Sequence, residues 1–168
     1  QYADFISEKG FLTVALLEGL FNSQTGYMDK VHDETGEKYP DLIADLVTVE
    51  IREAFYPYNL VHILPNNEIK TDGSIIATFP EHLNGNYFII IKHRNSIETW
   101  SSQPVSFSNG NIYYNFIDSE TKAFGNNLKL INGRFCIYAG DVNQDGSIDT
   151  ADMTFVDNDA GNFISGYL

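Results

Sequence analysis

The chain is poor in several residue types, and each shortage narrows what the protein can be. It has one cysteine, Cys136, so no internal disulfide framework is possible. Lys and Arg total 10 against 23 Asp and Glu, which gives a formal net charge of −13 at pH 7. This charge argues against nucleic acid and anionic membranes as partners, because both are bound through basic patches.

Long apolar runs and catalytic motifs are also missing. The apolar residues 11–20 fall short of the roughly 20 residues that a membrane-spanning helix needs, and they include Glu18. No nucleophile elbow, phosphate-binding loop or dinucleotide fingerprint occurs, and no two glutamates can be identified from sequence as an acid and a base. Cys136, between Phe135 and Ile137, is expected to be a small core residue. We therefore expect a protein that is not an enzyme.

Short β-forming segments separated by turn signals occupy most of the chain. Residues 46–52 alternate so that Val47, Val49 and Ile51 face inward, and residues 87–91 form the most β-prone run. Further strands are expected at residues 12–17, 60–64, 74–79, 85–93, 97–108, 111–117 and 129–138. Turns are expected at residues 65–67 and 71–73, with a bend in the last strand at residues 132–133. Asn109 and Gly110 predict either a hairpin turn or part of a longer loop.

These segments determine the fold class that we expect. About eight short strands, with no amphipathic helix before Thr150, predict an all-β fold built as an antiparallel β-sandwich. Residues 22–39 are polar, contain Gly26 and Gly36, and predict a loop longer than most connections in compact domains. We expect that loop to be functional, mobile or ordered by packing.

The most specific segment lies near the C-terminus, at residues 141–152. It has oxygen-bearing side chains at its first, third, fifth, ninth and twelfth positions, which are Asp141, Asn143, Asp145, Asp149 and Asp152. Ca²⁺ takes six to eight oxygen ligands, and loops that wrap it supply them at alternate residues, with a backbone carbonyl at the seventh position and glycine at the sixth. Ser147 and Gly146 stand at those two positions.

The surroundings of this segment fit a cation site. From Phe135 to the end the chain has six Asp and no Lys or Arg. Ile148 is expected to be the one buried apolar side chain of the loop, and a helix is expected from about Thr150 to Asn158. The alternative is an acidic, solvated turn that binds no metal.

The order strand, D-x-N-x-D-G-x-I-D-x-x-D loop and short helix resembles one repeat of a bacterial dockerin module. The resemblance covers residues 138–168 and departs from the full EF-hand pattern at Asp152, where glutamate would reach further. Dockerins have two such repeats and are attached to extracellular polysaccharide-degrading enzymes and to other secreted or surface proteins. The resemblance implies Ca²⁺ as cofactor, an extracellular or cell-surface location and a cohesin-like or surface protein as docking partner.

The remainder of the chain resembles, more diffusely, immunoglobulin-like or transthyretin-like sandwiches of large secreted bacterial proteins. The expected division is a linker at residues 1–10, a β-sandwich at residues 11–138, and a dockerin-like calcium loop, helix and truncated linker at residues 139–168. The expected function is therefore a non-catalytic accessory or docking module of a larger protein of polysaccharide breakdown. Exposed apolar residues after the loop, namely Met153, Phe155 and Val156, would support docking.

Two alternatives remain open from the sequence. A carbohydrate-binding module would stack sugar rings on exposed aromatic residues, for which the candidates are Tyr56, Tyr58, Trp100, Tyr113 and Tyr114. Neighbouring Tyr113 and Tyr114 must point to opposite faces of a strand, and core positions are favoured for most of the set. A glycoside hydrolase fragment would instead need two facing carboxylates in a cleft. The pair His93 and Arg94, at a strand end, is a further candidate for ligand binding.

Overall fold

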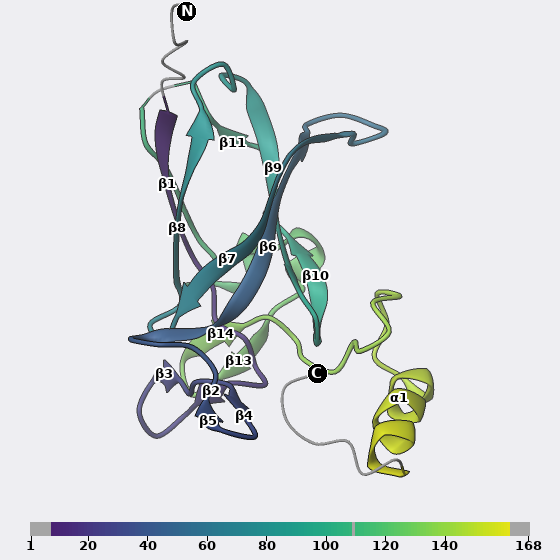
Figure 1. Cartoon of the computed structure of the whole chain (residues 1–168). Coiled ribbons are helices and arrows are strands. Elements are labelled where there is room, and N and C mark those ends of the chain that lie inside the picture. Colours follow the sequence, from purple (N-terminus) through teal and green to yellow (C-terminus); the bar gives the residue numbers. More distant parts are fainter. Residues whose placement is uncertain (1–7, 109, 162–168) are drawn as a thin grey trace, which may run out of the picture.

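The computed structural model describes residues 8–108 and 110–161, and its main element is a curled sheet of eight strands (Figure 1). The strands are β1 (Glu8–Val14), β6 (Ile43–Glu53), β7 (Leu60–Lys70), β8 (Ser74–Pro80), β9 (Asn86–His93), β10 (Ser96–Trp100), β11 (Val105–Ser106) and β12 (Ile112–Asn115). Their order is β10-β9-β6-β7-β8-β1-β12, and β11 also pairs with β9. All of these pairs are antiparallel except the parallel pair of β1 and β12, so the sheet is mixed.

The remaining elements are small, and most of the short strands lie below the sheet in Figure 1. Three two-stranded ribbons join β2 (Phe21–Asn22) to β3 (Tyr27–Met28), β4 (His32–Asp33) to β5 (Gly36–Glu37), and β13 (Lys129–Ile131) to β14 (Arg134–Cys136). The helical elements are the 3₁₀ turns η1 (Glu120–Lys122) and η2 (Phe124–Asn126) and the helix α1 (Thr150–Gly161). The expected all-β class is confirmed, and α1 begins at the expected residue. Among the residues described, no helix is long and apolar enough to span a membrane.

The core lies inside the curl of the sheet. Val47, Val49 and Ile51 are at most 2% exposed, which confirms the inward face expected for β6. Aromatic rings fill the space between strands, and the ring of Phe79 lies edge-on to Phe11 at 5.0 Å and to Phe107 at 5.5 Å. Such contacts add about 0.5–1.5 kcal/mol each beyond the area that they bury.

Both faces of β9 are covered along the centre of the strand. Four consecutive side chains of this strand, Phe88, Ile89, Ile90 and Ile91, are at most 8% exposed. Ile89 and Ile91 belong to the main core, and the alternation of a strand places Phe88 and Ile90 on the opposite face. A continuous apolar run is therefore the sequence signature of a strand with cover on both faces.

The structure contradicts one predicted turn and refines two others. Residues 65–67 are not a turn but a bulge within the continuous strand β7, where the pairing moves from Val47–Asn67 to Val49–Leu64. Pro65 has no N–H to donate to a strand ladder, so a bulge accommodates it where regular pairing would not. Asn66, with φ of 56°, takes up the local change of direction.

The other two cases concern Asn-Gly pairs. β11 pairs with β9, and β12 pairs with β1, so residues 109–110 do not close a hairpin between them, and Asn109 itself lies outside the described residues. By contrast, Asn132 and Gly133 form the tight turn of a hairpin between β13 and β14, where only a bend was expected. Both have positive φ, 46° and 80°, as the favoured two-residue hairpin turn requires.

Two segments that were not expected to form strands, residues 8–10 and 22–39, take part in the packed structure. β1 begins at Glu8, inside the range expected to be a linker, and the ammonium of Lys9 donates to the carbonyls of Leu83 (2.8 Å) and Phe107 (2.6 Å). The long polar segment of residues 22–39 is ordered by packing, one of the outcomes expected for it. Met28, 2% exposed, accepts the Leu17 N–H through its sulfur at 3.2 Å.

A buried charge joins β6 to the end of β9. Asp45 is fully buried and accepts hydrogen bonds from the Nε2–H of His93 at 3.0 Å and from the guanidinium of Arg94. On its other side, His93 Nδ1 lies 3.0 Å from the Ser96 hydroxyl. Removing one partner of such a pair is costly because the other charge is then left without compensation.

We expect Asp45→Asn to lower the free energy of unfolding by about 3 kcal/mol, the lower end of the range for broken buried pairs. The loss should stay at that end because the Arg94 side chain is 36% exposed and can reach water. Urea denaturation followed by far-UV circular dichroism measures it. The exposed Glu34 gives a control in Glu34→Gln, which should change stability by less than about 0.5 kcal/mol. Equal stability of the two variants would contradict this role of Asp45.

Candidate functional site

The segment 141–152 is attached to the edge strand β10. Ala139 forms a β-bridge with Ser96, the Gly140 N–H donates to the Asn95 carbonyl at 3.0 Å, and the Gln144 amide donates to the Ser96 carbonyl at 3.3 Å. The segment then leads away from the sheet into α1 (Figure 1). These contacts hold its first half against the sheet.

The first three candidate ligands fold toward one another. The Asp145 N–H donates both to Asp141 Oδ1 at 3.1 Å and to Asn143 Oδ1 at 2.9 Å. Two side-chain oxygens from alternate residues therefore lie within about 3 Å of one nitrogen. The Asn143 amide in turn donates to Asp145 Oδ2 at 2.8 Å. Asp141 is 1% exposed, so its charge is held by the loop and away from solvent.

The sharp turn at the sixth position is present. Gly146 has φ of 86°, a conformation that side chains with a Cβ seldom adopt. This turn lets the Gly146 N–H donate to Asp141 Oδ2 at 3.1 Å. The next residue, Ser147, donates its N–H to Asp145 Oδ1 at 2.9 Å, so the backbone winds around the carboxylates of the first and fifth positions.

Asp149 and Asp152 form the start of α1. Asp149 Oδ1 accepts the Ala151 N–H at 2.7 Å, while Asp152 Oδ2 accepts the Asp149 N–H at 2.9 Å, which is the reciprocal arrangement of a capping box. Asp152 Oδ1 also accepts the N–H groups of Val142 (2.8 Å) and Asn143 (3.2 Å). The hydrogen bond from the Asp149 N–H contributes most to lowering the pKa of Asp152 from 3.8, and those from Asn143 and Val142 add to it. Together they outweigh burial, which alone would raise this pKa.

The six predicted site residues thus form two groups. Asp141, Asn143 and Asp145 converge through shared hydrogen bonds, with Ser147 next to them, and Asp149 and Asp152 meet at the helix start. Within residues 8–108 and 110–161, no three His, Cys, Asp or Glu side chains are gathered as a metal-holding group. Calcium loops also use amide and backbone carbonyl oxygens, and a carboxylate has about four acceptor sites, so the bonds described leave acceptor sites on the loop oxygens open.

Ile148 was expected to be buried, and this was wrong. It is 47% exposed and packs its Cγ2 atom beside Gly140, where a Cβ would come within 3.1 Å. Met153, whose exposure was named as support for docking, is 61% exposed, and both residues line a pocket of about 580 Å³ between the loop and α1. The side chains of Phe155 and Val156, like residues 162–168, lie outside what the structure describes.

Among the aromatic candidates, Tyr113 and Tyr114 do point to opposite sides of their strand. Tyr113 is 58% exposed, while the Tyr114 ring packs on Phe116 at 4.8 Å and its hydroxyl donates to the Lys122 carbonyl at 2.5 Å. Tyr56 is 84% exposed. Tyr58 and Trp100 line a pocket together with Phe88 and Phe124.

Phe88 and Phe124 were missed as members of this pocket. Phe88 belongs to the apolar run of β9, whose sequence does not say which side chains face out. Phe124 gave a usable signal, because it is a lone aromatic residue in the polar stretch that follows Lys122. The pocket is assembled from four separate chain segments, so no local pattern contains it.

The glutamates that showed no pairing in the sequence include two that meet at one cation. The Lys92 ammonium lies 3.2 Å from Glu50 and 2.8 Å from Glu98. Burial alone would raise the pKa of Glu98, but hydrogen bonds from Lys92 and Trp100 outweigh it and lower that pKa. A carboxyl held ionised in this way is poorly suited to act as a general acid.

His93 and Arg94 both hydrogen-bond to Asp45, and both also line one small pocket. Asp45, His93 and Ser96 have the residue types of a nucleophilic triad, yet Ser96 is 1% exposed and does not line the pocket of about 190 Å³ beside His93. The geometry supports a structural link between β6, β9 and β10.

Comparison with protein-family models, with curated proteins and with solved structures found no match for this chain.

Cys136 should be unreactive in the folded protein. Its side chain is fully buried, so neither solvent nor reagents reach the sulfur. Burial above all, and then the nearby Glu18 carboxylate, raises the pKa of its thiol to about 12. Since the thiolate is the nucleophile, we expect no stoichiometric reaction with a chromogenic disulfide reagent at pH 8 until the protein is unfolded in urea. Rapid reaction of one thiol in the folded protein would show that Cys136 is accessible.

Proposed function

We propose that residues 141–152 bind one Ca²⁺ ion as the first repeat of a dockerin-like segment. The observation that carries this proposal is the convergence of Asp141 and Asn143 on the N–H of Asp145, with Gly146 turning the chain around them. A loop that brings hard oxygens together at alternate residues has the donor chemistry that Ca²⁺ prefers. An acidic turn without metal would have to hold the same carboxylates against their mutual repulsion.

The ion would be held by the residues named from the sequence. Asp141, Asn143 and Asp145 would supply side-chain oxygens, Ser147 its carbonyl, and Asp149 and Asp152 would close the shell directly or through water. Asp152 Oδ1 already accepts two N–H groups while Oδ2 accepts one. Ligation by Asp152 without loss of a hydrogen bond is therefore expected through Oδ2 alone.

The wider function that we propose is attachment of a larger secreted or surface protein to a partner. In this proposal the β-rich part is an immunoglobulin-like or transthyretin-like accessory module, and the C-terminal segment docks to a cohesin-like or surface protein in polysaccharide breakdown. The exposed Ile148 and Met153 beside the loop support docking, since they offer apolar surface that a partner would cover. Calcium outside cells is abundant enough to fill even weak loops.

The first test is calorimetric titration of Ca²⁺ into protein stripped of metal with a chelator. We expect saturable binding at one site, and we expect Asp145→Ala to abolish it because Asp145 supplies one ligand and orders two others. Asp118→Ala is the matched control, since Asp118 is an exposed aspartate outside the loop, and it should bind as the unmodified chain does.

Two results would contradict the calcium proposal. One is the absence of binding heat together with a melting temperature that does not change with calcium. The other is binding that Asp145→Ala leaves intact, which would place the ion elsewhere in the protein.

The second test concerns order in the C-terminal segment. Metal that binds only the folded loop stabilises it by mass action, so we expect amide exchange at residues 141–161 to be slow with calcium and at least about tenfold faster after chelation. Hydrogen–deuterium exchange with mass spectrometry measures this, and the β9 peptide serves as an internal control that should not change. Equal protection of residues 141–161 in the two states would refute metal-dependent order.

A further inference from the structure

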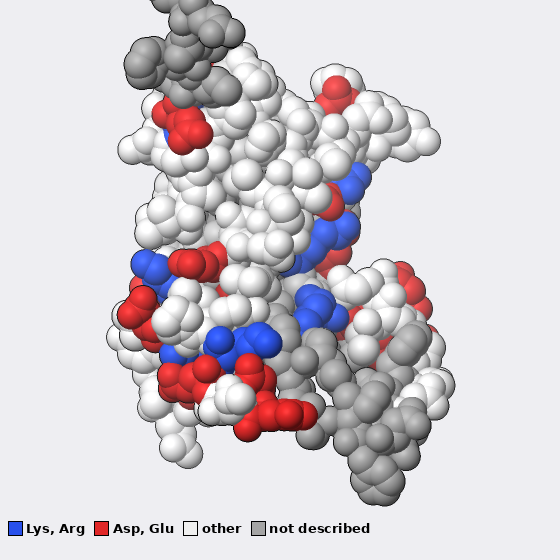
Figure 2. All heavy atoms as spheres, in the orientation of Figure 1, with Lys and Arg blue, Asp and Glu red and all other residues white. Residues whose placement is uncertain are grey.

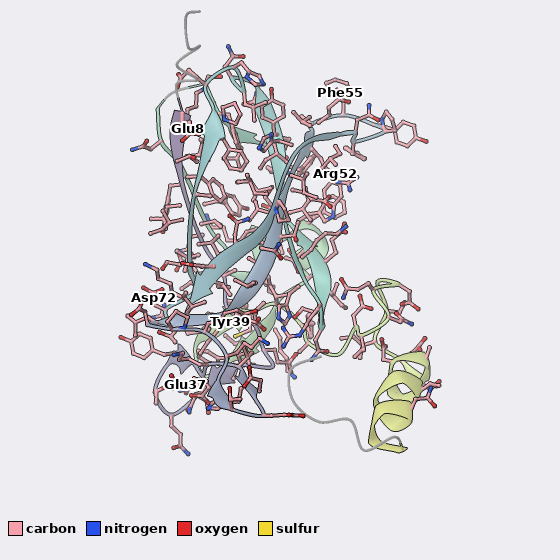
Figure 3. All side chains as sticks on the ribbon, viewed as in Figure 1. Glu8, Glu37, Tyr39, Arg52, Phe55 and Asp72 are labelled. Carbon is pink, nitrogen blue, oxygen red and sulfur yellow. The ribbon has the colours of Figure 1, made fainter. Side chains whose placement is uncertain are left out.

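A second site lies on the outer face of β9, apart from the calcium loop. The β6–β7 hairpin projects from the sheet, with Phe55 on its projecting part and Arg52 nearer the sheet (Figure 3). Tyr58 from this hairpin, Phe88 from β9, Trp100 from β10 and Phe124 from η2 line a pocket of about 280 Å³, here called the aromatic pocket. Its volume is close to the lower limit of about 300 Å³ for small-molecule sites.

The rings of the aromatic pocket form steep walls. Tyr58 meets Phe88 at 5.8 Å and 82°, and it meets Trp100 at 6.0 Å and 81°. Phe88 meets Trp100 at 5.6 Å and 60°. Phe124 stands 66% exposed at the mouth, and Tyr58 is 39% exposed. Three rings in mutual contact and one exposed ring leave apolar surface open to solvent. Exposed apolar surface of this kind is typical of ligand-binding or interaction sites.

The rim of the aromatic pocket is a chain of paired charges. The Arg52 guanidinium donates to Glu50 at 2.6 and 2.8 Å, Lys92 lies between Glu50 and Glu98, and the Trp100 indole donates to Glu98 at 2.5 Å. Two cations and two anions cancel, so the rim has no net charge. Basic side chains with acidic ones among them follow this flank of the molecule, whereas the upper part of the same face is almost uncharged (Figure 2).

This rim selects among classes of ligand. Arg52 already lies 5.6 Å from the centre of the Trp100 ring, so it would repel a cationic ligand that used the same ring. A wholly apolar ligand would remove water from the charged groups of the rim without replacing their hydrogen bonds. An uncharged ring with an apolar C–H face and hydroxyl groups at its edge satisfies both the walls and the rim.

The polar surface continues beyond the pocket. Lys92 and Glu98 also line a neighbouring pocket of about 440 Å³, whose other walls come from Ile97, Asn127 and the segment 141–152, through Asp141, Gln144, Asp145 and Gly146. A ligand of several linked units could therefore place one ring against the aromatic walls and its next units along these hydrogen-bonding groups.

We propose that the aromatic pocket binds one unit of an uncharged oligosaccharide or polysaccharide, with the chain continuing along Lys92 and Glu98. Tyr58, Trp100 and Phe124 contact the C–H faces of the sugar, and the rim donates to and accepts from its hydroxyl groups. The aromatic pocket itself shares no wall residue with residues 141–152, so binding of the first sugar unit does not depend on the calcium proposal, whereas the neighbouring pocket is partly lined by that segment.

The test is native gel electrophoresis through soluble xyloglucan, mixed-linkage β-glucan, arabinoxylan, galactomannan and amylopectin, followed by calorimetry with matching oligosaccharides. We expect at least one of these uncharged polysaccharides to retard the protein, both with calcium and with chelator. Phe124→Ala and Tyr58→Ala should each weaken that binding about tenfold or more, the loss expected when an aromatic contact is removed.

The control variant is Tyr113→Ala, because Tyr113 is 58% exposed, close to the 66% of Phe124, and does not line the pocket. Near-UV circular dichroism and the melting temperature of Phe124→Ala should match those of the unmodified chain, since the residue is exposed. Absence of retardation by all five polysaccharides would overturn the proposal. So would full binding by Phe124→Ala, or binding of poly-L-proline at the pocket without binding of any saccharide.

Discussion

Burial of β9 on both of its faces positions the two sites of this protein. Ile89 and Ile91 anchor the strand in the core, while Phe88 and Ile90 are covered on the other side. β10 pairs with this strand, and it supplies Trp100 to the aromatic pocket at one end and the Ser96 carbonyl to the segment 141–152 at the other. A shift of β10 relative to β9 would therefore disturb both sites at once.

The two sites are built by different physical means. In the loop, nearly every polar contact joins residues within ten positions of each other, because backbone N–H groups turn back onto the carboxylates that precede or follow them. In the aromatic pocket, contacts join segments far apart in the chain, and they depend on the ion pairs of Lys92 with Glu50 and Glu98 to hold the rim. The first site is therefore determined mainly by local sequence, and the second by the packing of distant segments.

The structure also explains how a chain of net charge −13 tolerates charges in its interior. Asp45 has His93 and Arg94 as partners, and Glu50 has Arg52 and Lys92. Arg52, Lys92 and Arg94 are thus placed beside acidic residues that the fold buries. Among the described residues no cation forms such a pair with the loop aspartates, and their charge is met by backbone N–H groups and by the Asn143 amide, which is the arrangement in which a bound cation would contribute most.

The sequence by itself determined the features that depend on interactions between residues close together in the chain. The spacing of oxygens in residues 141–152, the turn at Gly146, the start of α1 and the inward face of β6 all follow from contacts within a few residues, and the calcium assignment stays a prediction from that spacing. Tertiary structure alone decided the order of strands, the parallel pairing of β1 with β12, the bulge at Asn66 and the exposure of Ile148. These depend on which distant segments meet, and alternation along a strand contains no information about its neighbours. For the same reason, only the folded chain brings Tyr58, Phe88, Trp100 and Phe124 together.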